Sequence, residues 1–350
     1  MKNRMAILSG QEDIACVENE LNDKLQERDL LIKIEACNIC TSEYGIYSGA
    51  RKAKFPYTIG HEWSGHVVRC GTGVTRFKVG DYVVGCYEYD PASEEAQVGN
   101  SSSSPRTYAY DQLNDNGYYG RFRACAEYLI QPEISTFKMN ETVDPSEAAF
   151  LEPLSTVISG IKKMDLKVTD TVLVIGAGTM GILNALVASS YGATVVSTEF
   201  MPKKVEVARA LGLQTIQLRG SSLEEHVEQI KTESKIASFD KVIVAVGVSG
   251  AYQQAFRMLK RNDGLALLFA AGYPEPDLGI SANEIHYRKM TIVGTYTANY
   301  QDFKDAAFLL STGKIKVSLL VENRVPLSDI DAAMRQAIVP GAFRISVLCS

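Results

Sequence analysis

The chain has 350 residues, a formal net charge of −5 and a sequence pI near 5.6. Hydrophobic residues make up 46% and charged residues 22%, as in ordinary globular proteins, which excludes disordered, collagen-like and coiled-coil classes. The acidic balance argues against nucleic acid or an anionic membrane as the partner. Because the sequence shows no signal peptide and no run of roughly 18 apolar residues, we expect a cytoplasmic protein without a membrane span.

The first 150 residues are punctuated by glycine and proline and contain short β-rich segments. Three of these segments, residues 30–36, 66–70 and 81–85, predict a mostly β domain. Residues 87–120 stand apart, because they contain six tyrosines and four consecutive serines but neither cysteine nor histidine. This composition is typical of a solvated loop, with a substrate lid or a subunit contact as the alternative.

From about residue 153 onward, apolar runs alternate with helical stretches. The runs lie at residues 171–175, 193–198, 241–246, 264–271 and 290–294. Because these runs are continuously apolar, they predict a doubly wound parallel sheet with helices on both faces, over residues 154–294. The tail adds a predicted helix over residues 301–312 and a last strand over residues 343–349, which we expect to fold back onto the N-terminal domain.

A G-x-G-x-x-G motif, Gly176, Gly178 and Gly181, follows the strand predicted at 171–175 and precedes a helix predicted at 182–191. The first glycine permits a tight turn, the second lets the backbone approach a pyrophosphate, and the third lets the helix pack close to the strand. The helix N-terminus then offers unpaired N–H groups to the phosphates. The spacing predicts a dinucleotide site.

Glu199 lies 21 residues beyond Gly178, at the end of the second predicted strand of this domain. A carboxylate there can accept hydrogen bonds from the adenosine ribose and repels a 2′-phosphate, so we expect NAD as the cofactor. Lys203 and Lys204 keep NADP open as the alternative. The predicted cofactor-binding residues are Gly176, Gly178, Thr179, Met180, Gly181, Glu199, Lys204 and Gly247.

Four residues in and near the N-terminal domain offer donors for a metal: Cys40, His61, Glu62 and Glu152. A thiolate, an imidazole and a carboxylate are the ligand types of a catalytic zinc, which leaves one position for water or substrate. From these residues alone, a core cysteine, a surface histidine and a helix-capping Glu152 remain alternatives. Cys37 forms a C-x-x-C pair with Cys40, but a zinc ribbon needs a second pair, so we interpret Cys37 as a core residue.

The sequence resembles the zinc-dependent medium-chain alcohol and polyol dehydrogenases, a family that includes sorbitol, threonine and galactitol-phosphate dehydrogenases. The resemblance covers nearly the whole chain, in family order and spacing. It rests on residues 36–43 (ACNICTSE), 60–67 (GHEWSGHV), 80–81 (GD), 126–128 (AEY), 151–154 (LEPL) and 170–181 (DTVLVIGAGTMG). It implies a GroES-like, mostly β catalytic domain over residues 1–153 and 295–350, and a Rossmann domain over 154–294.

By the same resemblance, Cys40 and His61 are zinc ligands, and Glu62 and Glu152 are two carboxylates that alternate between direct and water-mediated coordination. Ser42 stands at the position of the hydroxyl that takes the substrate proton. The resemblance also implies a homodimer or homotetramer.

Three departures from the family pattern stand out. Glu43 replaces the usual aspartate and has one more methylene, so it must reach the ligand imidazole differently. Gly45 stands where many members have a proton-relay histidine, so the proton must leave through the cofactor ribose and water. Residues 87–120 replace the four-cysteine lobe that binds a structural zinc, so we expect one zinc per chain.

These features predict a zinc-dependent oxidoreductase that transfers a hydride between NAD(H) and a secondary alcohol or ketone. The expected substrate is a small polyol, cyclitol or sugar derivative, and Glu152 at the position of a second cysteine favours polyols by resemblance. Two alternatives remain at this point: a zinc-free NAD(P)H reductase on the same fold, and a non-catalytic dinucleotide-binding sensor.

Overall fold

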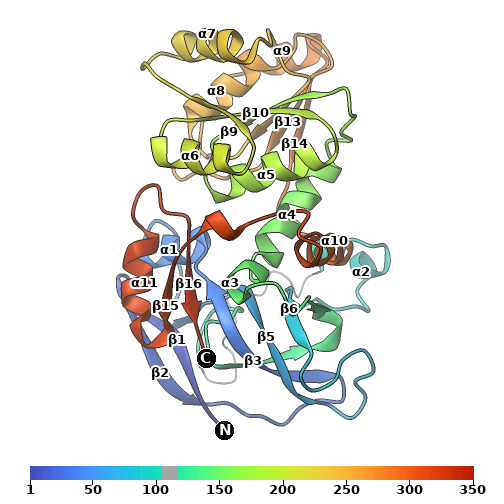
Figure 1. Cartoon of the computed structure of the whole chain (residues 1–350), viewed down its shortest axis with the longest axis vertical. Coiled ribbons are helices and arrows are strands. Elements are labelled where there is room, and N and C mark those ends of the chain that lie inside the picture. The colour runs from blue at the N-terminus through green and yellow to red at the C-terminus, as the bar shows by residue number, and fades with distance from the viewer. Residues whose placement is uncertain (88, 105–112, 114–116) are drawn as a thin grey trace. The chain divides into compact units, whose positions relative to one another are not determined.

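The computed structural model describes the chain except for residues 88, 105–112 and 114–116 (Figure 1). The chain divides into two compact units. Met1–Ser155 and Ala298–Ser350 form the first unit, and Thr156–Thr297 form the second.

The first unit is built on two sheets in which most neighbouring strands are antiparallel. One has the order β2-β1-β4, and the other has the order β15-β16-β3-β5-β6-β8, with β7 also paired to β3. The strands are β1 Lys2–Gly10, β2 Asp13–Glu20, β3 Asp29–Asn38, β4 Tyr57–Thr58, β5 Glu62–Cys70, β6 Tyr82–Gly85, β7 Tyr128–Pro132, β8 Thr136–Lys138, β15 Val321–Pro326 and β16 Arg344–Leu348. Because the three predicted segments overlap β3, β5 and β6, the mostly β domain is confirmed.

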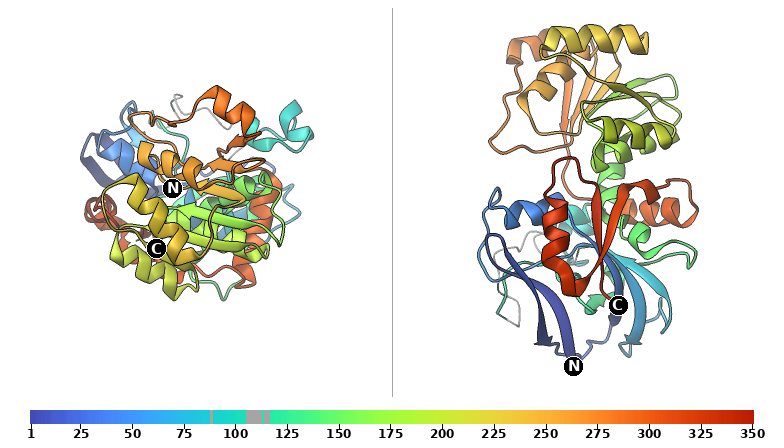
Figure 2. Two further views of the ribbon diagram at one scale, coloured as in Figure 1. Left: turned by 90° about the horizontal axis from the view of Figure 1, so that it is seen from above. Right: turned by 60° about the vertical axis from the view of Figure 1, so that its left-hand side comes forward.

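Helices cover parts of these sheets. In the first unit they are α1 Thr41–Tyr47, α2 Glu94–Gln97, α3 Pro145–Ala148, α10 Tyr300–Ser311 and α11 Ile330–Ala337, while α4 Leu151–Lys162 contains the boundary between the units. Short 3-10 turns lie at η1 Ser101–Ser103, η3 Glu133–Ser135, η4 Ser318–Leu320 and η5 Leu327–Asp329. Helix α11 packs along β16 and β2, as the right-hand view of Figure 2 shows.

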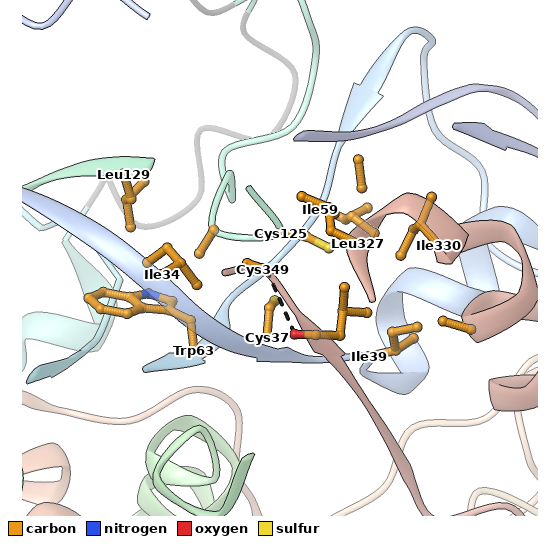
Figure 3. Packing of buried hydrophobic residues seen from close by; sticks show 14 of the residues in the cluster. Ile34, Cys37, Ile39, Ile59, Trp63, Cys125, Leu129, Leu327, Ile330 and Cys349 are labelled. Atoms are coloured by element: carbon orange, nitrogen blue, oxygen red, sulfur yellow. Dashed lines mark hydrogen bonds between the residues drawn. The ribbon is translucent and has the colours of Figure 1, made fainter. Parts of the chain in front are cut away.

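The C-terminal strand completes the larger sheet of the first unit. β16 pairs antiparallel with β3, and Val347 lies opposite Cys37. The side chains of Cys37, Cys125 and Cys349 meet in the hydrophobic core, where Figure 3 shows them among isoleucines and Trp63. The hydrogen bond with Cys125 lowers the pKa of the Cys37 thiol, but burial outweighs this contribution and raises the pKa to about 12. A buried thiol that holds its proton at neutral pH is unreactive, which agrees with a core role for Cys37.

The second unit contains a six-stranded parallel sheet in the order β11-β10-β9-β12-β13-β14. Its strands are β9 Thr171–Ile175, β10 Thr194–Glu199, β11 Gln214–Gln217, β12 Lys241–Val244, β13 Leu265–Leu268 and β14 Thr291–Gly294. Its helices are α5 Thr179–Ser190, α6 Pro202–Ala210, α7 Leu223–Ser234, α8 Ser249–Met258 and α9 Ala282–Tyr287, and Figure 1 shows them around the sheet. The predicted doubly wound sheet is confirmed. In the described part of the chain, no helix combines the length and the apolar character that a membrane span needs.

Part of the segment 87–120 is packed rather than solvated. Ser101 and Ser104 are buried, and the backbone N–H of Tyr300 donates to the Ser101 hydroxyl at 2.9 Å. The backbone N–H of Ser102 donates to the side-chain oxygen of Asn299 at 3.0 Å. For these serines the solvated-loop interpretation is wrong, because they hold the start of α10. Most of the stretch 105–116 lies outside the described residues.

Candidate active site

Cys40 is placed by the end of β3 and the start of α1. It is the N-cap of α1, and its backbone N–H donates to the Glu43 carboxylate at 2.8 Å. Ser42 is half-buried in the first turn of the same helix. The short helix therefore puts the thiol of Cys40 and the hydroxyl of Ser42 two residues apart on a fixed backbone.

Glu43 ties this helix to the segment that carries His61. Its Oε1 accepts a hydrogen bond from the backbone N–H of Gly60 at 2.7 Å and lies 3.1 Å from Nδ1 of His61. Burial raises the pKa of Glu43, but His61 and the two backbone donors outweigh burial and leave it below its ordinary value. The side chain of Glu43, one methylene longer than aspartate, thus reaches the imidazole of His61. It also caps α1, because it accepts the hydrogen bond from the backbone N–H of Cys40.

Gly60 must be glycine for this arrangement to form. Its φ is +108°, and a Cβ there would lie 2.1 Å from the backbone nitrogen of Cys125. The chain can therefore turn tightly against the Cys125 segment and present His61 to Glu43.

His61 is buried, and its two ring nitrogens face different groups. Nδ1 faces Glu43, so the other ring nitrogen, Nε2, is directed away from Glu43. Nε2 lies 4.0 Å from a carboxylate oxygen of Glu152. Burial lowers the pKa of His61, but Glu43 and Cys40 outweigh burial and raise it well above its ordinary value. The negative groups around His61 therefore favour a positive charge at this position.

Donor atoms of Cys40, His61 and Glu62 lie within 4.8 Å of one another. This set of one thiolate, one imidazole and one carboxylate fits a zinc ion by its chemistry. Glu62 is also bound by Arg344, whose Nε and Nη2 donate to its two carboxylate oxygens at 2.8 and 2.7 Å. Arg344 supplies a positive charge that compensates Glu62 in the absence of other cations.

Glu152, the second residue of α4, is the other carboxylate at this place. Burial raises its pKa to about 7; His61 opposes that shift, and the negative charge of Glu62 adds to it. The structure thus brings all four predicted donors together, although Glu152 is not within the tighter cluster of the other three. A desolvated carboxylate beside a histidine is suited to a cation.

The predicted dinucleotide residues gather at the carboxyl ends of β9, β10 and β12 in the second unit. Gly176 has a φ of +96°, and a Cβ on Gly181 would lie 1.9 Å from the carbonyl oxygen of Gly176. Gly178 is the N-cap of α5, so Thr179 and Met180 form its first turn. A Cβ on Gly178 would lie 3.7 Å from Nζ of Lys204, which places a cation beside the turn.

Glu199 is the last residue of β10 and is held by backbone groups. Its carboxylate accepts hydrogen bonds from the N–H groups of Ala177 at 3.0 Å, Phe200 at 2.8 Å and Met201 at 3.1 Å. Gly247 follows β12 and packs so closely on Ala271 that a Cβ would lie 2.2 Å from its carbonyl oxygen. Since β9 lies between β10 and β12, these residues surround the point where the strand order reverses, which is where open α/β sheets bind ligands.

Arg344 was missed by the sequence analysis, although a signal for it exists. It stands in the buried strand RISVL, three of whose five residues are apolar, and a buried arginine in such a strand requires an anionic partner. Phe122 was missed as well; its ring lies 4.9 Å from that of His61, centroid to centroid. Nothing in its local sequence marks that contact.

Comparisons with known proteins identify the family of the chain. The alcohol dehydrogenase GroES-like domain matches residues 26–141, and the zinc-binding dehydrogenase domain matches residues 179–312. A sorbitol dehydrogenase of Halalkalibacterium halodurans is 29% identical over 307 residues, 86% of each chain. An L-threonine 3-dehydrogenase of Idiomarina loihiensis is 27% identical over 318 residues, 89% of each chain.

Among solved structures, a putative zinc-binding dehydrogenase from Sinorhizobium meliloti bound to NADP has a TM-score of 0.86 and 24% identity, covering 99% of both chains. That likeness shows the fold. With the two domain matches and the sequence relatives, it confirms the resemblance of the motifs: the chain belongs to the zinc-type medium-chain alcohol dehydrogenase family and is an oxidoreductase.

Proposed function

We propose that the protein is an NAD(H)-dependent, zinc-containing dehydrogenase that interconverts a secondary alcohol and a ketone of a polyol, cyclitol or sugar derivative. The observation that carries the proposal is the donor set of half-buried Cys40 and buried His61, Glu62 and Glu152, with the imidazole oriented by Glu43. The sorbitol dehydrogenase relative supports the substrate class.

In this proposal Cys40, His61 and Glu152 hold the zinc. Glu62 is the weaker candidate for direct coordination, because each of its oxygens already accepts a hydrogen bond from Arg344. Glu152 has no such arginine contact among the described hydrogen bonds, and burial raises the pKa of its carboxyl group to about 7. When bound, zinc lowers the pKa of a substrate hydroxyl and orients it.

The remaining steps belong to residues of this chain. Ser42 would take the proton of the substrate hydroxyl as it gives up its own proton towards water, because Gly45 offers no relay side chain. Glu43 orients the imidazole of His61, so that its other nitrogen would be available to a bound zinc. Glu199 would hold the adenosine ribose of NAD(H), the cofactor that would supply or take up the hydride. Lys204 beside Gly178 supports binding of the pyrophosphate.

The test measures metal content and NADH production together. Purified protein loaded with zinc should hold one ion per chain and reduce NAD with at least one member of a panel of polyols, cyclitols and sugar derivatives. A chelator should abolish this activity with little loss of folded protein, measured by circular dichroism. Reduction of activated double bonds by a metal-free protein would instead support the zinc-free reductase, and two tight zinc ions per chain would contradict the single site.

A further inference from the structure

Two buried polar side chains bind carbonyl groups of α3. Nδ2 of Asn38, in β3, donates to the carbonyl oxygen of Ser146 at 3.0 Å. The hydroxyl of Ser64, in β5, donates to the carbonyl oxygen of Pro145 at 2.8 Å. Asn38 and Ser64 are both 0% exposed, so water does not compete for these bonds. The two bonds therefore hold the short helix α3 on β3 and β5.

The ends of β3 and β5 that bind α3 also lead to three of the four predicted metal donors. Cys40 follows Asn38, the last residue of β3, after one intervening residue. Glu62 is the first residue of β5 and directly follows His61. In the pairing of the two strands, Asn38 lies opposite Glu62. Asn38 and Ser64 are thus attached to the same backbone segments that position these three donors.

Glu152, the fourth donor, is joined to α3 by backbone hydrogen bonds. The N–H of Phe150 donates to the carbonyl oxygen of Glu147 in α3, and the N–H of Leu154 in α4 donates to that of Phe150, each at 3.0 Å. Phe150 is fully buried, which leaves this joint little room to move. Because Glu152 is the second residue of α4, a displacement of α3 is transmitted to it.

A further side-chain contact of α3 lies at the surface. Arg324, in β15, donates to the Ser146 hydroxyl at 3.2 Å and to the Asp144 carboxylate at 3.0 Å. The two charged side chains are 42% and 41% exposed, and an ion pair so exposed contributes little. A buried carbonyl that loses its donor, by contrast, stays desolvated and unpaired. The two interior bonds are therefore the stronger constraint on α3.

We propose that Asn38 and Ser64 are positioning residues, which hold Glu152 within reach of the candidate metal site by binding α3. Glu152 depends on such support more than the other donors do, because it lies outside their tighter cluster, with a carboxylate oxygen 4.0 Å from Nε2 of His61. The inference rests on the proposed function, in which Glu152 holds the zinc. It assigns the placing of that ligand to two side chains outside the donor set.

A double-mutant cycle on zinc affinity tests whether the two residues act through Glu152. In competition with a chromophoric chelator, Asn38→Leu and Ser64→Ala should each bind zinc about ten- to a hundredfold more weakly, as for other residues that support metal ligands. In a Glu152→Ala background they should change the affinity by less than about twofold, because a ligand that is already absent cannot be displaced. Ser64→Ala is the milder change and keeps the test decisive if Asn38→Leu does not fold. Equal losses in both backgrounds would overturn the inference.

Asn184 provides a matched control in the second unit. It is 0% exposed, its Nδ2 donates to the carbonyl oxygen of Met180 at 2.8 Å, and its Oδ1, like that of Asn38, has no partner among the described residues. Asn184→Leu should therefore lower stability in urea unfolding as Asn38→Leu does, but should leave zinc affinity within about twofold of the unmodified protein. A loss of zinc affinity as large as that of Asn38→Leu would mean that general destabilisation, and not the placing of Glu152, is responsible.

Crystal structures of the metal-free protein give a readout that needs neither zinc nor turnover. In Asn38→Leu and Ser64→Ala, the Glu152 carboxylate should lie farther from Nε2 of His61 than in the unmodified protein, while the other three donors keep their separations. An unchanged distance in both variants would refute the positioning role, and zinc bound by the unmodified protein would then leave the proposed function intact. A longer distance in a protein that binds no zinc would uphold the positioning role and refute the proposed function.

Discussion

Arg344 binds both carboxylate oxygens of Glu62, and this ion pair is buried, with side chains 6% and 0% exposed. Burial disfavours the charge on Arg344, yet Glu62 raises its pKa above the ordinary value. Nη2 of Arg344 also lies 3.8 Å from the sulfur of Cys40. This ion pair therefore joins β16 to the candidate metal site that Cys40, His61 and Glu62 form.

Replacing Arg344 with methionine should destabilise the protein by about 3–5 kcal/mol, because it leaves the carboxylate of Glu62 buried without its partner. Urea unfolding followed by circular dichroism measures the loss. The double variant Glu62→Gln with Arg344→Met should recover part of it, since no charge is then left uncompensated. A cost below about 1 kcal/mol for the single variant would show that another cation replaces Arg344.

Cys40→Ser and His61→Ala should each abolish turnover and metal binding while NADH still binds. The donors lie in the first unit, whereas the residues predicted to bind the dinucleotide lie in the second. Elemental analysis, Trp63 fluorescence and titration with NADH give the three readouts. Substantial activity in a metal-free Cys40→Ser protein would rule out zinc chemistry.

Glu43→Asp should weaken zinc binding about ten- to a hundredfold, although aspartate is the usual residue of the family. The shorter side chain cannot reach the N–H groups of both Cys40 and Gly60, which Glu43 bonds with separate oxygens. Competition with a chromophoric chelator gives the affinity, and the exposed Glu206→Asp serves as the matched control. Unchanged zinc affinity would mean that the contact with His61 alone suffices.

Glu199→Ser should reduce the preference for NAD over NADP, because it removes a carboxylate that faces the 2′-phosphate in our proposal. The expected change in the ratio of kcat/KM values is about ten- to a hundredfold, equivalent to about 1–3 kcal/mol. The ratio is the useful readout, since the loss of three backbone hydrogen bonds lowers stability for both cofactors alike. Equal efficiency with both cofactors in the unmodified protein would contradict the assignment.

Glu133 should make stability depend on pH. It is buried and bonded to Arg28 at 2.6 Å and to the N–H groups of Thr75 and Arg76. Burial raises its pKa, but these partners outweigh burial and leave it below the ordinary 4.5. Its contribution is thus complete above the unfolded-state pKa and is lost as pH falls through the lower folded-state value.

The variant Glu133→Gln should therefore be less stable by about 1–3 kcal/mol at pH 7. The difference from the unmodified protein should shrink below about pH 4.5, where the unfolded chain takes up the proton. Urea unfolding at several pH values measures both free energies. A difference that stays constant down to pH 3 would contradict this origin.

The sequence predicts best where one local pattern determines both structure and chemistry. The apolar run 171–175 is β9 without adjustment, and the glycine motif after it begins α5, although the helix starts at Thr179 rather than at 182. β11 was missed because two of its four residues are glutamines, so it shows no continuous apolar run. Neighbouring strands, not its own composition, make it part of the sheet.

The donor residues of the candidate metal site could be predicted from their sequence motifs, but the residues that surround them could not be predicted. Arg344 lies 282 residues from Glu62, and Phe122 lies 61 residues from His61, so no local spacing relates them. Such contacts depend on how β5, β16 and the segment before β7 are arranged. The family resemblance places ligands, whereas the three-dimensional structure is needed to find the charges that surround them.

The pairing of β16 with β3 also determines the order in which a newly synthesised chain can fold. Residues 156–297 leave the ribosome as a complete unit before Arg344 has been translated. Until then, β3 has an unpaired edge, and Glu62 is without its arginine. The second unit can therefore form during translation, whereas the first unit must wait for β16, so a chain stalled before Arg344 would carry the second unit without a complete first one.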